Sequence, residues 1–379
     1  MVKSFEVAWS RDKLDALRAA LRRYRLPATP REAAWEYGCD GAFLKELCTY
    51  WAGEFDVEAA AATLNRYPQI VTEIDGITLH AVHVVGEAGG KRPLLLCHGW
   101  PGSHFEFWQV IEPLAFPSRH GGRKEDAFDL VIPSLPGFGF SGKPAAPIGA
   151  RTTARLFATL MRERLGYERY CVQGGDWGAA VNTWLALDHA ASVKAVHLNL
   201  IIVHPRATPE TPEEIAWAKA RDDAQLRLGA YAMLQATKPH SLAYAIADNP
   251  VAQAAWIVER FYDWSDRRER RFEEIFSRDE LLTNVMIYVM NDAFVSAIYY
   301  YAAAMTERVR LLPEGRRVEV PTAFTAYPDP RMPAPPRHWI ERGYNLTRWT
   351  VPPRGGHFAA TEQAAYFVDD LREWGRGVA

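Results

Sequence analysis

The residue best placed to do chemistry is Asp176, at the centre of the stretch VQGGDWGAA. An apolar run ends just before it, a helix-length segment follows, and Gly174 and Gly178 stand two positions away on either side. Glycines in these positions are typical of a sharp strand-to-helix turn that exposes a nucleophile, most often a serine. Asp176 alone would fit an ordinary helix N-cap equally well. The two glycines favour the nucleophile.

A carboxylate in the place of a hydroxyl predicts attack on saturated carbon. A serine that attacked such a carbon would be left as an ether, which water cannot cleave, whereas a carboxylate is left as an ester with a carbonyl that water can attack. Aspartate side chains are normally ionised at neutral pH, so no base is needed to activate them. The substrate must therefore carry a leaving group on alkyl carbon, either an epoxide oxygen or a halide.

Two further segments complete such a site. The segment HGWPG follows an apolar run directly, so we expect the backbone N–H groups of Trp100, within it, and of Trp177 to bind an oxyanion. His357 lies on a Gly-Gly loop near the C-terminus, and Asp329 follows the preceding strand-like run. The chain order of Asp176, Asp329 and His357 is the nucleophile, acid, histidine order of α/β-hydrolases. His357 would activate water, and Asp329 would orient His357.

The elements that position these residues form an α/β pattern. Helix-length segments such as 152–165 and 177–189 separate several apolar runs. This alternation predicts an α/β-hydrolase fold with a mostly parallel, eight-stranded sheet and helices on both faces. The runs that we expect to form the strands are 70–74, 78–85, 93–99, 129–135, 169–175, 193–200, 318–327 and 346–352.

The alternation breaks once, and the break divides the chain. Beyond about residue 205 the pattern is helical, starting with Thr211 as an N-cap before Pro212 and two glutamates. A helical insertion at the carboxyl ends of parallel strands covers the edge where ligands bind. We therefore expect an N-terminal helical wrapping segment, a first core part, a helical lid and a second core part, at residues 1–66, 67–204, 205–312 and 313–379.

Composition excludes several classes of protein. The 379 residues are 48% hydrophobic and 24% charged with a formal charge of −2, which argues against disorder and against nucleic-acid binding. No apolar run approaches the roughly 18 residues of a membrane span, so we expect no membrane anchor and a cytoplasmic location. The four cysteines form no C-x-x-C pair, which argues against a zinc site. The G-x-G-x-x-G pattern at 137–142 resembles a dinucleotide-binding motif, but that motif needs a helix to begin there, and prolines follow instead. We expect no metal and no cofactor, and the sequence leaves a homodimer open.

Tyrosines in the lid bear on the choice of leaving group. An epoxide oxygen departs as an alkoxide and needs a proton donor such as a neutral tyrosine, whereas a halide needs N–H donors and apolar packing. In a run of three tyrosines on one helix, only one can point squarely into a pocket. Spacing does not decide which of the tyrosines face Asp176. The lid tyrosines are Tyr231, Tyr244, Tyr262, Tyr288, Tyr299, Tyr300 and Tyr301.

Six motifs together resemble the microsomal-type epoxide hydrolases, a branch of the α/β-hydrolase superfamily, over nearly the whole chain. The resemblance implies conversion of a small apolar epoxide and water into a vicinal diol. It also implies that Tyr231, four residues before the glutamine of QATKP, and Tyr301, which closes the helix after LLTNVM, bind the epoxide oxygen. The motifs are HGWPGS (98–103), PGFGFSG (136–142), GGDWG (174–178), QATKP (235–239), LLTNVM (281–286) and RGGHFAA (354–360).

One departure from the family pattern leaves the acid open. Members of this family usually carry the acid two residues after an aromatic-proline pair, where this chain has Pro330, so Asp329 stands one position early. A rearranged loop, a different acid and impaired ester turnover all remain open, and Asp329 would also fit a plain turn residue.

Two alternative functions remain: a haloalkane dehalogenase with the same nucleophile, and a silent protein that binds an apolar ligand. The pattern typical of that dehalogenase family is HGNP, where this chain has HGWP around Trp100.

Overall fold

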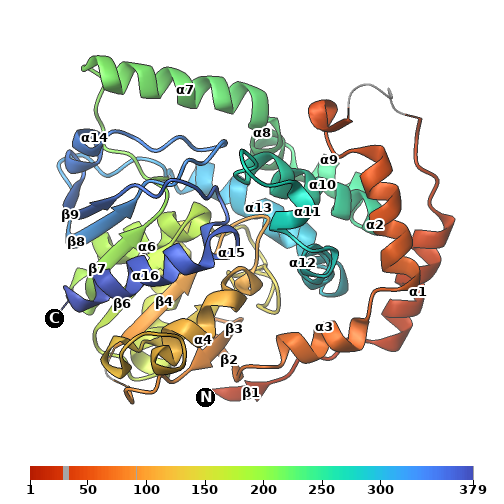
Figure 1. The fold of residues 1–379 in the computed structure, drawn as a ribbon, viewed down its shortest axis with the longest axis horizontal. Helices are drawn as coiled ribbons and strands as arrows, with labels where there is room; N and C mark the ends of the chain where they lie inside the picture. Colours follow the sequence, from red (N-terminus) through yellow and green to blue (C-terminus); the bar gives the residue numbers. More distant parts are fainter. Residues whose placement is uncertain (29–33, 91, 379) are drawn as a thin grey trace.

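The computed structural model describes residues 1–28, 34–90 and 92–378. Its centre is one nine-stranded sheet, whose strands run through the middle of Figure 1. The strand order is β1-β2-β3-β5-β4-β6-β7-β8-β9, and every pair from β5 to β9 is parallel. The predicted mostly parallel sheet is confirmed. The strands are β1 (Lys3–Phe5), β2 (Gln69–Ile74), β3 (Ile77–Val84), β4 (Pro93–Cys97), β5 (Asp129–Pro133), β6 (Tyr170–Gly174), β7 (Val193–Leu198), β8 (Val318–Thr325) and β9 (Tyr344–Thr350).

The sheet has one strand more than the eight that the sequence predicts. Strand β1 pairs antiparallel with β2 at the edge of the sheet, with Ser4 opposite Ile70. It lies in the segment expected to be wholly helical. Three residues with exposed or half-buried side chains give no apolar alternation, so nothing in the local pattern distinguishes this strand from a loop.

The helices are α1 (Arg11–Arg23), α2 (Gly41–Gly53), α3 (Val57–Leu64), α4 (Trp108–Ala115), α5 (Ala150–Thr159), α6 (Asp176–Asp188), α7 (Pro212–Leu228), α8 (Ala230–Thr237), α9 (Pro239–Ile246), α10 (Pro250–Trp264), α11 (Phe272–Ile275), α12 (Arg278–Met290), α13 (Ala293–Thr306), α14 (Arg337–Glu341), α15 (Ala359–Glu362) and α16 (Ala364–Arg376). A π-helical turn, Leu160–Arg164, continues α5. The two helix-length segments expected at 152–165 and 177–189 form α5 with the turn that continues it, and α6.

Both faces of the central strands are buried, which explains their continuous apolar runs. In β4, Leu95 and Cys97 join the apolar cluster that contains α5 and α6, while Leu94 and Leu96 join the cluster that contains α4 and α16. Successive side chains of a strand point to opposite faces, so a strand between two helical layers needs apolar residues at every position. The core of the molecule therefore has three layers.

Helices α7 to α13 lie between β7 and β8 and cover the carboxyl ends of the parallel strands (Figure 1). The two ends of this lid meet in an isolated parallel bridge between His204 and Leu311. The predicted start of α7 is confirmed. Thr211 Oγ1 accepts the backbone N–H of Glu214 at 3.2 Å, and the Glu214 carboxylate accepts the N–H of Thr211.

The N-terminal helices pack against the lid, along the right-hand side of Figure 1. Lys13 Nζ donates to Asp292 Oδ2 at 2.7 Å, and the Tyr50 hydroxyl donates to Asp279 Oδ1 at 2.7 Å. Both acceptors belong to the lid, at the N-cap of α13 and in the first turn of α12. The segment therefore ties the lid to the edge of the sheet.

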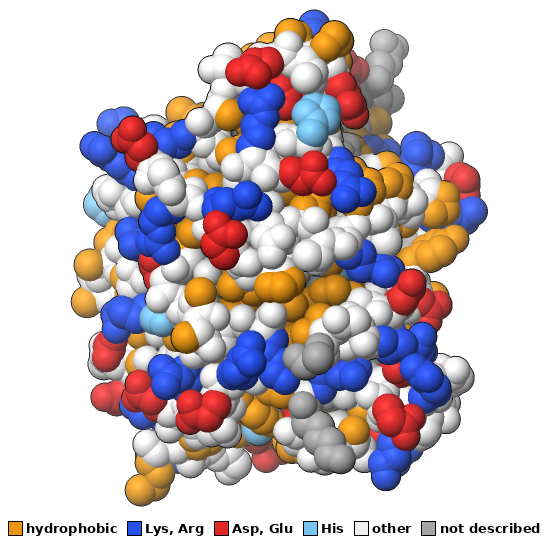
Figure 2. Space-filling model, turned by 90° about the vertical axis from the view of Figure 1, so that its left-hand side faces the viewer, with side chains coloured by type: hydrophobic (Ala, Val, Ile, Leu, Met, Phe, Trp, Pro, Cys, Tyr) orange, Lys and Arg blue, Asp and Glu red, His pale blue; other side chains and the backbone are white. Residues whose placement is uncertain are grey.

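Charged side chains of both signs are interspersed over the face in Figure 2, in keeping with the small net charge of −2. Within the described residues, no single helix has the length and apolar composition of a membrane span. Helices α12 and α13 pass that test only as a pair, and they are bent by 85°.

Candidate active site

Asp176 sits at a strained turn between β6 and α6. Its φ is +44°, in the left-handed region that residues other than glycine rarely adopt. A Cβ on Gly178 would overlap the carbonyl oxygen of Cys97, and a Cβ on Gly174 would lie 2.7 Å from the carbonyl carbon of Gly178. The two flanking glycines are therefore required by close packing against β4, as their spacing predicts.

A backbone amide from the neighbouring strand end faces the Asp176 carboxylate. Trp100 N–H donates to Asp176 Oδ1 at 2.9 Å. Gly99 lets the two segments approach, because a Cβ there would collide with that carboxylate. The Trp177 amide is the next one along the chain, at the start of α6. The structure thus brings the Trp100 amide onto the carboxylate, and the Trp177 amide follows Asp176 in the chain.

His357 lies between two carboxylates. Its Nε2 is 3.4 Å from Asp176 Oδ2, and its Nδ1 is 2.8 Å from Asp329 Oδ2. The His357 backbone N–H donates to the carbonyl of Trp264, the last residue of α10, at 3.0 Å. The imidazole is thereby fixed from the side chain and from the backbone, with one ring nitrogen directed at the Asp176 carboxylate.

The turn that carries Asp329 accounts for its shifted position in the sequence. Asp329 Oδ1 accepts the backbone N–H groups of Arg331 at 2.7 Å and Met332 at 3.0 Å, which leaves Oδ2 for His357. The side chain thus folds over the chain that follows it, as aspartate does in tight turns. The structure thus pairs Asp329 with His357 through a rearranged loop, and the rate of ester turnover stays a prediction.

The electrostatics of His357 follow from its two acidic neighbours. Burial disfavours the imidazolium and by itself lowers the pKa of His357, but the charge of Asp329 and the hydrogen bonds and charge from Asp176 and Asp329 outweigh it. The pKa of His357 is therefore raised well above its usual value. Part of that increase depends on the negative charge of Asp176, and would be lost if that carboxylate were esterified.

Glu362 is a buried acid that the sequence did not single out. Its carboxylate accepts the N–H groups of Gly356 at 3.0 Å and Phe358 at 2.9 Å, on either side of His357, and that of Asp266 at 2.7 Å. Burial raises the pKa of Glu362 to about 7. An acid five residues beyond the histidine was the only available signal. Glu362 joins the loop of His357 to the lid segment that follows α10.

The two predicted lid tyrosines converge above Asp176. Tyr231 comes from α8 and Tyr301 from α13, and their ring centroids are 5.8 Å apart. The Tyr231 ring stacks on Trp100 at 5.1 Å. The Tyr301 hydroxyl is buried and has no hydrogen-bond partner among the described residues. Burial, followed by Tyr231 and Asp176, raises the pKa of Tyr301 well above its usual value, so the hydroxyl keeps its proton.

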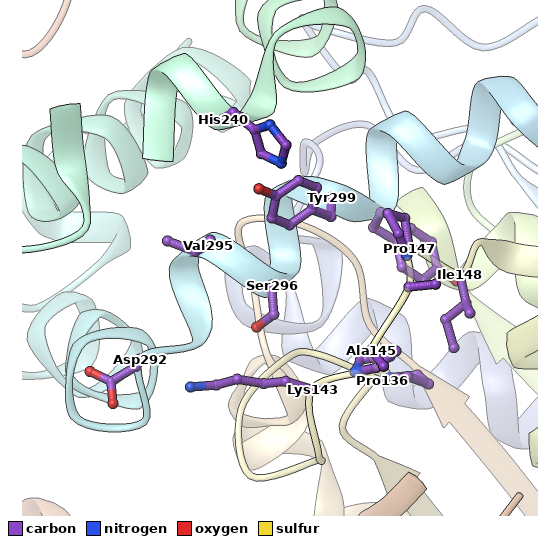
Figure 3. A pocket seen from close by; sticks show the side chains of 13 residues that line it. Pro136, Lys143, Ala145, Pro147, Ile148, His240, Asp292, Val295, Ser296 and Tyr299 are labelled. Carbon is purple, nitrogen blue, oxygen red and sulfur yellow. The ribbon is translucent and has the colours of Figure 1, made fainter. Parts of the chain in front are cut away.

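The run of three tyrosines on α13 divides between separate environments. Tyr301 lines a cleft of about 370 Å³ with Asp176, whereas Tyr300 donates to Thr153 Oγ1 at 3.0 Å. Tyr299 faces a different cleft, of about 510 Å³, where it lies near His240 (Figure 3). That cleft contains none of the predicted site residues. Only Tyr301 of the three therefore lines the cleft that contains Asp176, in keeping with helical geometry.

No group of three His, Cys, Asp or Glu side chains in the described part of the chain is arranged to hold a metal ion. The reaction without metal or cofactor stays a prediction. The groups assembled at this site are a carboxylate nucleophile, an imidazole with an acidic partner, backbone donors and a buried phenol. Together they can open a strained ring at carbon and then cleave an ester.

Comparisons with known proteins agree with this chemistry. Residues 2–107 match the sequence family described as epoxide hydrolase N terminus, and residues 92–360 match the alpha/beta hydrolase fold family. Epoxide hydrolase 1 of Oryctolagus cuniculus is 34% identical over 98% of this chain and 88% of that protein. The chain belongs to the epoxide hydrolase family. A Stigmatella aurantiaca protein named "Putative epoxide hydrolase" is 38% identical to this epoxide hydrolase, over 98% of the chain and 84% of that protein.

A solved structure extends the likeness to the whole fold of this epoxide hydrolase. The Aspergillus niger epoxide hydrolase superposes with a TM-score of 0.86 at 29% identity, covering 100% of this chain and 97% of that one. The predicted α/β-hydrolase fold and the predicted activity on epoxides are confirmed. The dehalogenase and silent-protein alternatives lose their basis, because these three full-length relatives are epoxide hydrolases by name.

Proposed function

We propose that this epoxide hydrolase works through a covalent ester on Asp176. The carboxylate attacks one oxirane carbon, the carbon–oxygen bond breaks, and the oxygen takes a proton from Tyr301 with Tyr231 as a second donor. The product is a hydroxyalkyl ester and a tyrosinate. The single observation that carries the proposal is the Asp176 carboxylate, with Trp100 N–H at 2.9 Å on one oxygen and His357 Nε2 at 3.4 Å from the other.

Hydrolysis of the ester then falls to His357. Its Nε2 takes a proton from water, hydroxide adds to the carbonyl carbon of Asp176, and the N–H groups of Trp100 and Trp177 bind the oxyanion. The ester carbon–oxygen bond breaks, the imidazolium protonates the departing alkoxide, and the remaining carboxyl proton returns to the tyrosinate. Substrate and water are thereby converted into a vicinal diol, and each group regains its starting state.

The change of charge on Asp176 suits the order of these steps. Before attack, its charge helps to hold the pKa of His357 high, so the imidazole is a poor base. Esterification removes that charge, so the pKa of His357 falls when a base is needed. Asp329 retains its charge and stabilises the imidazolium that forms.

The cleft also bears on the kind of substrate. Ile202, Met233 and Met332 line it together with Asp176, which supports an epoxide with an apolar body. A volume of about 370 Å³ supports a small one.

Turnover in ¹⁸O-labelled water tests the covalent scheme. Over several turnovers, oxygen from water should enter the Asp176 carboxylate, because the oxygen delivered to the substrate comes from the enzyme. Peptide mass spectrometry locates the label. A labelled diol beside an unlabelled Asp176 peptide would mean that water attacks the epoxide directly. Asp188, at the other end of α6, lies in the same helix and serves as the internal control that should stay unlabelled.

A further inference from the structure

One wall of the catalytic cleft carries a buried positive charge. Arg331 is only 5% exposed, and its Nη2 donates to Gln225 Oε1 at 2.6 Å. Its Nε is buried and has no hydrogen-bond partner among the described residues. Nor does any carboxylate in the described ranges pair with its guanidinium within 4.0 Å. A desolvated guanidinium without a counter-charge is costly unless a ligand supplies one.

Arg331 is close to the reacting groups. It lies two residues beyond Asp329 and donates its backbone N–H to that carboxylate, so the same turn positions the acid and the arginine. Its guanidinium carbon is 5.9 Å from the ring centroid of Tyr231. Arg331, Tyr231 and Asp176 line one cleft. A group bound by Arg331 would therefore be held beside the epoxide.

Two other arginines line the cleft, and among the described residues only one of them forms a salt bridge with a carboxylate. Arg221 is neutralised by Asp222, at 2.8 Å. Arg310 is exposed, lies with its guanidinium carbon 5.7 Å from the ring centroid of Trp177, and has no salt bridge within the described part of the chain. Two uncompensated cations thus border the cleft, one buried and one exposed.

The chemistry of the guanidinium favours a carboxylate as the missing partner. Nε retains a free N–H beside Nη2, which has a second hydrogen to donate, and this planar edge of a guanidinium matches the two oxygens of a carboxylate. A monoanion suits the cleft better than a phosphate dianion, because Asp176 also lines it and would repel the extra charge.

We propose that Arg331 binds a carboxylate of the substrate, so that the preferred substrates are epoxides whose apolar body ends in a carboxylate. This inference rests on the proposed function, since it assigns a substrate class to the same cleft. A neutral epoxide would leave the guanidinium desolvated and unpaired when the cleft fills, which penalises binding.

Matched pairs of substrates test the proposal. The ω-epoxides of hexenoic, octenoic and decenoic acid are each compared with their methyl esters by diol formation. For at least one chain length, kcat/KM for the acid should exceed that for the ester by about tenfold or more, the scale of a charged hydrogen bond. In Arg331→Gln this acid-to-ester ratio should fall by about tenfold, and Arg331→Lys should restore part of it. A purely structural role for Arg331 would change both substrates alike and leave the ratio intact.

Arg337→Gln is the matched control. It removes the same charge from a guanidinium that pairs with Glu341 on the surface, outside the cleft, and should leave the ratio unchanged. Should the Arg331 variants fail to fold, calorimetry on the wild type decides: octanoate should bind at least about tenfold more tightly than octanamide.

Several outcomes would overturn the proposal. Equal kcat/KM for acid and ester at every chain length is one, and an unchanged ratio in a folded Arg331→Gln variant is another. Diol from the esters without any preference for the acids would overturn only this inference. Absence of diol from every member would instead contradict the proposed function, and octanoate binding would then still test the role of Arg331.

Discussion

Beyond the carboxyl ends of the parallel strands, the acids Asp329 and Glu362 are surrounded by hydrogen-bond donors. In the lid, by contrast, the Tyr301 hydroxyl has no hydrogen-bond partner among the described residues. Asp329 accepts two backbone N–H groups and the His357 ring, and Glu362 accepts three backbone N–H groups. Arg331, which shares the turn of Asp329 and donates to Gln225 of the lid, also keeps an unpartnered Nε within that range.

This contrast separates the groups that hydrolyse the ester from the groups that bind the substrate. Groups that act on the ester are preorganised by hydrogen bonds that exist before substrate arrives, because the ester carbonyl is always that of Asp176. Groups that meet the substrate keep open hydrogen-bonding capacity, which each epoxide fills in its own way. We therefore expect changes at the sheet edge to impair ester hydrolysis, and changes in the lid to impair ring opening.

Replacing His357 should have the largest effect on turnover. His357→Gln removes the base but leaves Asp176 and both tyrosines, so ring opening continues and the ester accumulates. Steady-state turnover should fall by about a thousandfold or more, and intact-protein mass spectrometry should find the enzyme heavier by one substrate.

His240→Gln is the control for this variant. His240 faces the other cleft beside Tyr299 (Figure 3), so its replacement should leave turnover intact. Undiminished diol formation by His357→Gln would exclude His357 as the base.

Removing the lid phenols should impair the opposite half of the reaction. Tyr301→Phe should slow ring opening by about a hundredfold, and Tyr231→Phe by a smaller factor, because each removes one donor to the developing alkoxide. Rapid-quench measurement of ester formation isolates this step, and ester hydrolysis should change less.

Tyr299→Phe provides the matched comparison, since it makes the same change two residues away on a face turned from Asp176. If it slowed ring opening as much as Tyr301→Phe, the assignment of Tyr301 would be wrong.

A smaller effect is expected at Glu362, which positions His357 without touching the substrate. Glu362→Gln replaces one of the two acceptor oxygens with an NH₂ group. This group cannot accept a backbone N–H, so the His357 loop loses at least one hydrogen bond. We expect ester hydrolysis to slow by about tenfold, with ring opening less affected. The exposed acid of α16, in Glu373→Gln, is the control that should change neither step.

The pH dependence of folding gives this variant a second readout. Burial raises the pKa of Glu362 to about 7, above its value of 4.5 in the unfolded chain, so the folded state binds more protons between these values. The stabilisation is complete below about pH 4.5 and is lost as the pH rises through 7. Glu362→Gln should flatten the fall in unfolding free energy across this window. Glu106, whose pKa burial raises to about 8, also titrates in both proteins, and in the variant it loses only the repulsion from Glu362. An unchanged slope would contradict the titration of Glu362.

The smallest effect concerns the lid's own stability. Thr211→Ala removes the N-cap of α7 and should cost about 1 kcal/mol of unfolding free energy, measured by urea denaturation, without a change in kcat. Thr208→Ala, at an exposed position just before the helix, should cost less. A large loss of kcat in Thr211→Ala would show that the cap also shapes the cleft.

The local sequence pattern predicted most of the strands, the strand-to-helix turn at Asp176 and the N-cap of α7. These features depend on residues that are close together in the sequence. The tyrosine pair came from resemblance, since helical spacing allowed any of several phenols. Strand β1 is too short and polar to signal itself. Pairing of Asp329 with His357 depends on how one proline-rich turn folds, and the contacts of Glu362 and Arg331 exist only after distant segments pack together.

The bridge between His204 and Leu311 brings the two ends of the lid side by side. An insertion with adjacent ends can change length or composition without moving the strands that flank it. The lid is therefore a separable unit: transplanting 205–310 between relatives should transfer the preferences set by lid side chains, while the preference assigned to Arg331 and the chemistry of the recipient sheet stay the same.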